Sequence, residues 1–208
     1  MSKFYVVGIG PGHSDYLLPK ARKLIDSADV IIGGKRNIAS VGCNEQELVY
    51  ITADLSLIKA YIDQHHETKT IVMIVSGDTG FYSMLSFVRR NYTEDCYEVV
   101  PGISSMQYMF SAIQQPWQDA YVGSVHGREL DVVSLATTYQ LTGLLTDYKN
   151  TPATIAQDLA GKGDYKLFVG ERLSYDDEVI TVGTPDEIMS KSFDSLSVVI
   201  IENLNWEV

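Results

Sequence analysis

Four short segments constrain this chain more than any other feature, because each stands where an apolar run gives way to a loop. They are residues 6–12, 75–80, 101–105 and 144–147. Three of the four loops lead into helical patterns of apolar residues. Open α/β sheets bind ligands at the carboxyl ends of their strands, where such loops gather backbone polar groups. The sequence therefore predicts an α/β enzyme that acts on a small molecule.

Composition excludes one class of partner. The chain has 208 residues, of which 45% are hydrophobic and 21% charged, as in a soluble globular protein with one large domain or two small ones. It carries 27 acidic and 16 basic side chains, for a formal net charge of −11. No basic tract is present that could follow a phosphate backbone. We therefore expect no nucleic-acid partner.

Apolar stretches and cysteines together favour a cytoplasmic location. No apolar stretch approaches the ~20 residues that a membrane helix needs, so we expect no membrane partner. The two cysteines, Cys43 and Cys96, lie far apart in the chain and form no metal-spaced pair. Both are expected to be reduced thiols, and no metal site is expected.

The first half of the chain alternates strands and helices. Short apolar runs predict strands, which are residues 4–8, 29–33, 70–75 and 98–100. Apolar residues at helical spacing predict helices over residues 19–27, 55–64, 81–88 and 106–113.

A domain boundary is expected at residues 114–116, where Gln-Gln-Pro ends a helix without apolar periodicity. The chain then divides into residues 1–114 and 115–208. The second domain is predicted to contain a mixed sheet whose expected strands are residues 120–125, 141–146, 165–169, 179–182 and 196–201. Helices are expected at residues 131–139, 152–160 and 185–189, the last two beginning at Thr-Pro pairs that supply a capping hydroxyl.

The glycine-rich first loop must be tested against dinucleotide binding. That fingerprint needs three glycines at set spacing and an acid after the second strand. Here the third glycine of the loop at residues 8–12 does not stand at the required spacing. Asp29 comes before the second predicted strand instead of after it, and the helix that follows the loop begins only near Pro19. An NAD-linked oxidoreductase stays a less favoured function, and for Gly8 alone a tight turn with unusual backbone angles is the simpler interpretation.

These segments together resemble those of the tetrapyrrole methylases, which transfer a methyl group from S-adenosylmethionine to porphyrin and corrin precursors. The resemblance rests on the Gly-x-Gly-Pro-Gly loop at residues 8–12, Ala28-Asp29-Val30, Ser76-Gly77-Asp78 and residues 101–105. It spans almost the whole chain. Residues 33–36, 124–128 and 145–147 are most similar to the branch that methylates carbon 5 of cobalt-precorrin-7 in anaerobic cobalamin biosynthesis.

The resemblance implies two α/β domains with S-adenosylmethionine in the cleft between them, a homodimer, and a possible functional association with a precorrin decarboxylase. It also implies the cofactor-binding residues, which are Pro11, Gly77, Asp78, Phe81, Ser104, Ser105, Thr146, Glu171, Arg172 and Leu173. Two positions depart from the family pattern. Leu18 stands where the family commonly has a threonine, so the first helix lacks its usual hydroxyl cap. Thr79 stands where the family commonly has a proline, so this loop is expected to be less rigid.

Several of these positions have a second interpretation. S-adenosylmethionine has no phosphate to cradle, so backbone groups and a few small side chains suffice to hold it. Asp78 can accept a hydrogen bond from a ribose hydroxyl or the ligand amine, or it can cap the next helix. Ser104 and Ser105 can likewise donate to the cofactor or cap the helix that follows them.

Methyl transfer to a ring carbon is an in-line displacement that depends mainly on positioning and needs no nucleophilic side chain. A general base is needed only to remove a proton from the methylated carbon, and His126 is the candidate. It can instead be a substrate hydrogen-bond donor or a surface histidine. For the carboxylates of a corrin substrate the candidate partners are Lys35, Arg36 and Arg128, although Lys35 can also be a solvated surface charge.

Three competing functions stay open at this point. The chain can be a member of the same family that acts on a different substrate. It can be an oxidoreductase that uses NAD, or a ligand-sensing module that binds without catalysis.

Overall fold

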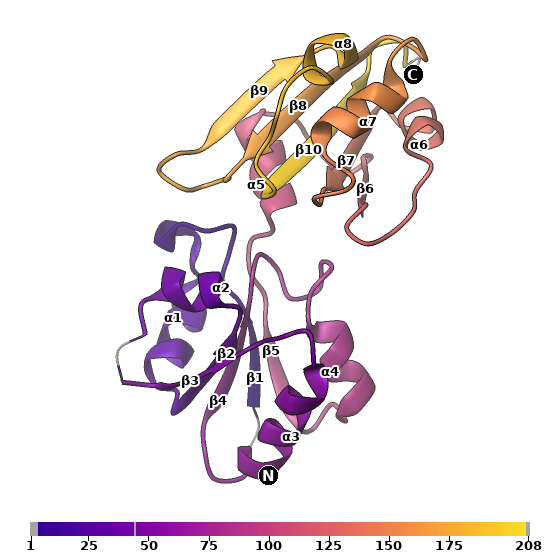
Figure 1. The fold of residues 1–208 in the computed structure, drawn as a ribbon. Helices are drawn as coiled ribbons and strands as arrows, with labels where there is room; N and C mark the ends of the chain where they lie inside the picture. Colours follow the sequence, from indigo (N-terminus) through magenta and orange to yellow (C-terminus); the bar gives the residue numbers. More distant parts are fainter. Residues whose placement is uncertain (1–3, 44, 207–208) are drawn as a thin grey trace. The chain divides into compact units, whose positions relative to one another are not determined.

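The computed structural model describes residues 4–43 and 45–206 of the chain. The chain divides into two compact units between Ser104 and Ser105, and each unit is a sheet covered by helices (Figure 1). This division falls one helix before the junction expected at residue 114. The helix α5 (Ser105–Ala112) therefore belongs to the second unit.

A five-stranded parallel sheet forms the centre of the first unit, in the order β3-β2-β4-β1-β5. Its strands are β1 (Phe4–Gly8), β2 (Val30–Gly33), β3 (Glu47–Tyr50), β4 (Ile71–Val75) and β5 (Tyr97–Val100). Gly8 pairs with Val75, and Val7 pairs with Val100, so β1, β4 and β5 end in line. The loops that follow these three strands consequently start at one edge of the sheet.

Helices cover both faces of this sheet, as Figure 1 shows. Helices α1 (Pro19–Asp26) and α2 (Lys35–Val41) pack on one face, where Ile25 and Ile38 join the strand residue Val7 in an apolar core. Helices α3 (Leu55–His65) and α4 (Leu85–Asn91) pack on the other, which Phe4 and Val6 enter. The side chains of β1 enter the two cores in this way because successive residues of a strand point to opposite faces of the sheet. A short 3-10 helix, η1 (Ser14–Tyr16), precedes α1.

The second unit has a mixed sheet, which confirms the sequence-based expectation. Its strand order is β6-β7-β10-β8-β9, with β6 parallel to β7 and antiparallel pairing between β7 and β10, β10 and β8, and β8 and β9. The strands are β6 (Tyr121–Ser124), β7 (Leu141–Leu145), β8 (Tyr165–Glu171), β9 (Val179–Gly183) and β10 (Ser197–Asn203).

One face of the second sheet packs against α6 (Val132–Thr138), α7 (Pro152–Leu159) and α8 (Pro185–Ile188). Leu144 lies in that core. The neighbouring residue Gly143 points to the opposite face, where a Cβ atom would come within 2.5 Å of Met106 Sδ in α5. Glycine at this position therefore lets α5 lie close to the sheet. Among the described residues, no helix is both long and apolar enough to cross a membrane.

Three local expectations need correction. The helix predicted from residue 81 begins at Leu85, because Tyr82 has a left-handed backbone with φ 51°. Strand β3 and helix α2 were not expected. Strand β3 is an edge strand whose residues are mostly exposed, and the apolar run at residues 48–51 is too short to distinguish a strand from a helix by periodicity alone.

The helix starts agree better with expectation. The Thr151 and Thr184 hydroxyls accept hydrogen bonds from the amides of Thr154 and Glu187, which confirms both predicted caps. In the part of the chain that the structure describes, no side chain caps α1 at Leu18.

Candidate functional site

Glycines allow the loops after β1, β4 and β5 to pack directly against one another. A Cβ atom on Gly8 would lie 2.6 Å from the amide nitrogen of Gly102 and 2.7 Å from the carbonyl oxygen of Gly77. A Cβ atom on Gly102 would lie 2.2 Å from that same oxygen. No side chain fits at these distances, so backbone meets backbone. The three loops therefore form one connected rim at the edge of the first sheet.

The first and second loops are also joined by a two-way bridge. The Gly10 amide donates to the Gly77 carbonyl at 3.2 Å, and the Gly77 amide donates to the Gly10 carbonyl at 2.8 Å. Gly10 and Gly77 have φ values of 82° and 68°, in the left-handed region that favours glycine. Pro11 follows directly and is buried. The pattern of glycines is thus explained by backbone contact, and Pro11 is brought beside Gly77.

Asp78 links the second loop to the third. Its carboxylate accepts a hydrogen bond from the Gly80 amide at 2.8 Å through Oδ1 and from the Gly102 amide at 3.1 Å through Oδ2. Met84, rather than Asp78, occupies the N-cap position of α4. Asp78 is therefore a brace between loops, and its carboxylate lies at the rim.

Four further positions belong to the second and third loops or follow them directly. The ring of Phe81 packs edge-on against Tyr82, with 4.9 Å between centroids. Thr79, which stands where the family pattern has proline, is buried. Its carbonyl oxygen accepts a hydrogen bond from the Ser83 hydroxyl, and this contact stabilises the turn. Ser104 is buried at the end of the first unit, and Ser105 is the first residue of α5.

Lys35 and Arg36 begin α2 and are exposed. The Lys35 ammonium lies 5.9 Å from the centroid of the Tyr50 ring. An open cavity of about 530 Å³ adjoins Lys35 and Tyr50, and the other residues that line it are Ile38, Ala39, Gly42, Cys43 and Leu48. A cation beside an aromatic and aliphatic wall suits an acidic ligand with an apolar body.

In the second unit, Asp147 gathers backbone donors from two loops. Its Oδ2 atom accepts from the Gly127 amide at 2.8 Å, and Oδ1 accepts from the amides of Lys149 and Asn150 at 2.8 and 2.7 Å. These hydrogen bonds, with Asn150 and Gly127 contributing most, lower the pKa of Asp147 to about 2. The carboxylate is thus ionised at neutral pH.

His126 and Arg128 lie on the loop that Asp147 holds, after strand β6. Both are exposed. The His126 amide donates to the Ser124 hydroxyl at 3.2 Å, and the Arg128 amide donates to the Val125 carbonyl at 3.3 Å. An imidazole and a guanidinium therefore stand on one short exposed loop.

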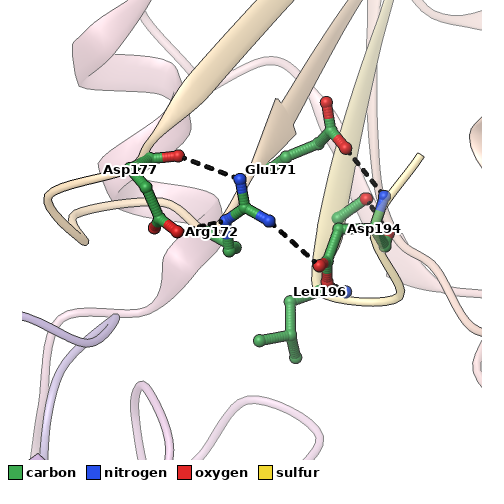
Figure 2. A network of polar contacts seen from close by, with 6 residues as sticks. Glu171, Arg172, Asp177, Asp194 and Leu196 are labelled. Atoms are coloured by element: carbon green, nitrogen blue, oxygen red, sulfur yellow. Dashed lines mark hydrogen bonds and ion pairs between the residues drawn. The ribbon is translucent and has the colours of Figure 1, made fainter.

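Arg172 connects the end of β8 to the segment before β10 (Figure 2). Its Nε atom lies 3.0 Å from Asp177 Oδ2, and its Nη1 atom lies 3.3 Å from Asp194 Oδ2. Glu171 Oε1 accepts from the Asp194 amide at 2.7 Å. Arg172 has φ 46°, and Leu173 beside it is buried. The ion pairs therefore hold a strained turn in place.

Thr146 belongs to the same connected set. Its buried hydroxyl donates to the Ser197 carbonyl at 2.8 Å, and the Ser197 hydroxyl donates to the Asp194 carbonyl. Thr146 is thereby linked through Ser197 and Asp194 to Arg172. A role for Asp194 could not be predicted from local sequence patterns, because its contacts with Glu171 and Arg172 bridge more than 20 residues of chain. Asp147 was also missed, although it ends one of the four loop segments.

Comparison with known proteins places the chain in a family. A family model described as "Tetrapyrrole (Corrin/Porphyrin) Methylases" matches residues 3–189. The cobalt-precorrin-7 C(5)-methyltransferase of Salmonella typhimurium is 30% identical over 95% of this chain and 98% of its own length. A probable enzyme of the same name from Methanocaldococcus jannaschii is 28% identical over 95% and 97%.

Among solved structures, the uroporphyrin-III C-methyltransferase of Thermus thermophilus, complexed with S-adenosylhomocysteine, has the same fold. Its TM-score is 0.77 at 21% identity, and the match covers 96% of this chain and 97% of that one.

Proposed function

This chain belongs to the tetrapyrrole (corrin/porphyrin) methylase family, and on that premise we propose that it methylates carbon 5 of cobalt-precorrin-7 with S-adenosylmethionine in cobalamin biosynthesis. One observation carries the choice of substrate. Three relatives that are 28–30% identical over 95% of this chain and 97–98% of their own length are named cobalt-precorrin-7 C(5)-methyltransferases, one of them as probable. A probable cobalt-precorrin-2 C(20)-methyltransferase that aligns over 97% of the chain is 27% identical. The glycine rim of the first unit supports the choice of cofactor.

The rim suits S-adenosylmethionine better than a dinucleotide. The amides of Gly80 and Gly102 already donate to Asp78, so they do not face a pyrophosphate. The Asp78 carboxylate adds negative charge, which repels phosphate and attracts a cation such as a ligand ammonium or sulfonium. In this proposal Pro11, Gly77, Asp78, Phe81 and Ser104 hold the cofactor in the first unit. The proposed cofactor-binding residues of the second unit are Ser105, Thr146, Glu171, Arg172 and Leu173.

Bound S-adenosylmethionine supplies a methyl group on a positively charged sulfur, which an electron-rich ring carbon can attack. The protein's part is to hold the reacting groups in line and to exclude water. His126 then accepts the proton that leaves the methylated carbon, or donates a hydrogen bond to the substrate. Lys35, Arg36 and Arg128 pair with substrate carboxylates, the arginines in bidentate fashion.

Several parts of the proposal go beyond the reaction itself. A homodimer, an association with a precorrin decarboxylase and a cleft that holds the cofactor between the two domains stay predictions. So does a cytoplasmic location, which agrees with Cys43 and Cys96 being free thiols.

A methyl-labelling experiment tests the proposed function. The protein is incubated with carbon-13 methyl-labelled S-adenosylmethionine and a series of cobalt-precorrins, and the new methyl group is located by NMR. We expect the label on carbon 5 of cobalt-precorrin-7. Label on another substrate or ring carbon would assign a different member of the family.

Calorimetry distinguishes a methyltransferase from an NAD-linked oxidoreductase and from a ligand-sensing module. We expect S-adenosylhomocysteine to bind and NADH not to bind. The reverse result would favour the oxidoreductase. Cofactor binding without methylation of any precorrin would favour a ligand-sensing module.

A further inference from the structure

Asp147 has no role in the proposed reaction, yet its carboxylate is one of the most highly coordinated side chains of the second unit. It is buried, with 6% of its surface exposed, and accepts three backbone hydrogen bonds. Buried carboxylates are costly unless they are fully bonded, so such an arrangement points to a specific structural task.

The two carboxylate oxygens of Asp147 serve different loops. Oδ1 accepts from Lys149 and Asn150 and closes the turn that leads from β7 into α7. Oδ2 reaches back 20 residues to the Gly127 amide in the loop after β6. Asn150 adds a second connection, because its Nδ2 atom donates to the Val125 carbonyl at 2.9 Å. The loop after β6 is thus held at both Val125 and Gly127 by the turn after β7.

Packing contributes little to the loop after β6. His126, Gly127 and Arg128 are all exposed, and apart from Gly127 and its two chain neighbours no described residue has an atom within 4 Å of the position that a Cβ on Gly127 would occupy. Gly127 also has φ 63°. Because glycine adopts positive and negative φ values about equally well, its backbone could take many other conformations without the hydrogen bond to Asp147. Hydrogen bonds to Asp147 and Asn150 therefore help to fix this loop, together with Val125 at its start, which is buried in the core and whose amide donates to the Leu145 carbonyl at 2.9 Å.

We propose that Asp147 is a positioning residue, which fixes the loop of residues 126–128 so that His126 and Arg128 meet the corrin substrate. The inference rests on the proposed function, in which these two side chains contact the substrate. In this inference Asp147 acts through the loop and makes no contact of its own with substrate or cofactor. Its loss should therefore weaken substrate capture, whereas the cofactor, whose proposed contacts do not include Asp147, should bind as before.

The substitution Asp147→Asn isolates this task. An asparagine can keep its single carbonyl oxygen toward Lys149 and Asn150, which leaves its NH₂ group facing the Gly127 amide, where two donors cannot bond. We expect hydrogen exchange of the Gly127 amide to accelerate on the order of tenfold, as the loss of one charge-assisted hydrogen bond implies. The KM for cobalt-precorrin-7 should rise by about the same factor, with the Kd for S-adenosylhomocysteine within about twofold of the wild-type value.

Asp131→Asn is the matched control. Asp131 is also a loop aspartate of the second unit, whose carboxylate accepts the Ser134 amide at 3.0 Å as the cap of α6. Asparagine caps helices about as well as aspartate, so exchange at Gly127 and both binding constants should stay unchanged. Asn150→Ala is the second variant if Asp147→Asn does not fold, and it should shift exchange and KM in the same direction.

The outcomes separate this inference from the proposed function. Unchanged exchange at Gly127, or faster exchange without a rise in KM, would overturn the positioning role. If the wild-type protein binds no S-adenosylhomocysteine or methylates no corrin, the proposed function fails. In that case, faster exchange confined to residues 126–128 in Asp147→Asn would still support the tether.

Discussion

The Asp78 carboxylate accepts a hydrogen bond from the amide of Gly102, 24 residues later in the chain, with 3.1 Å between Oδ2 and the nitrogen. This contact joins the loop after β4 to the loop after β5. Together with the Gly10–Gly77 bridge it connects the three loops that carry the glycine motifs. The motifs therefore depend on one another in space, although they are far apart in the sequence.

Replacing Asp78 with alanine should weaken S-adenosylhomocysteine binding by about tenfold or more, because the Gly80 and Gly102 amides lose their acceptor and the rim loses its negative charge. We expect the fold to persist at a cost of about 1–3 kcal/mol. Calorimetry and urea unfolding measure the two effects. Asp54→Ala, which removes the cap of α3, is the control and should lower stability without changing affinity. Equal affinities for Asp78→Ala and wild type would contradict the placement of this residue in the cofactor site.

Adding a methyl group at Gly102 should destabilise the first unit by about 3 kcal/mol or more, because the new atom would overlap the Gly77 carbonyl oxygen and backbone cannot yield easily. The midpoint of thermal unfolding reports this change. Gly34→Ala provides the comparison, since its nearest described atom would be Asn37 Nδ2 at 3.9 Å. That variant should lose less than about 1 kcal/mol. A normal melting temperature for Gly102→Ala would mean that the loops are not in close contact.

Acid should reduce the contribution of Asp147 to stability. Backbone hydrogen bonds, chiefly from Asn150 and Gly127, lower its pKa from the ordinary 3.8 to about 2. A carboxyl whose pKa is lower in the folded state stabilises the fold above its unfolded-state pKa and loses that contribution as the pH falls through the folded value. The difference in urea midpoint between wild type and Asp147→Asn should therefore be constant from about pH 7 to 5 and shrink between about pH 4 and 2. A difference that is constant to the lowest pH would contradict the assignment.

Replacing Arg172 with methionine should cost about 1 kcal/mol at low salt, because its partners Asp177 and Asp194 are partly exposed and solvent screens the pairs. The cost should fall at high salt. Thermal unfolding at two ionic strengths measures this. Lys59→Met removes an exposed pair with Asp63 within α3 and should show the same salt trend without affecting cofactor binding. For Arg172→Met we also expect weaker S-adenosylhomocysteine binding, since the turn from Glu171 to Leu173 loses its anchor. Unaltered binding would remove this turn from the cofactor site.

Local patterns in the sequence predicted most of the elements. Buried strands such as β1 and β4 are continuous apolar runs, and the caps at Thr151 and Thr184 need only neighbouring residues. Strand β3 was not predicted, because the apolar run at residues 48–51 is too short to distinguish a strand from a helix by periodicity alone. Helix α4 begins later than predicted because Tyr82 adopts a left-handed backbone.

The sequence by itself determined the class of fold, the family and the segments that form the loops, because apolar periodicity and glycine patterns act over short distances. Only the tertiary structure decided what the acidic side chains in those loops do. Asp78, Asp147 and Asp194 each bond to backbone or side-chain groups 20 or more residues away. A carboxylate that caps a helix, binds a ligand or braces a loop looks the same in a sequence, and the partner that distinguishes these roles is brought to it by folding.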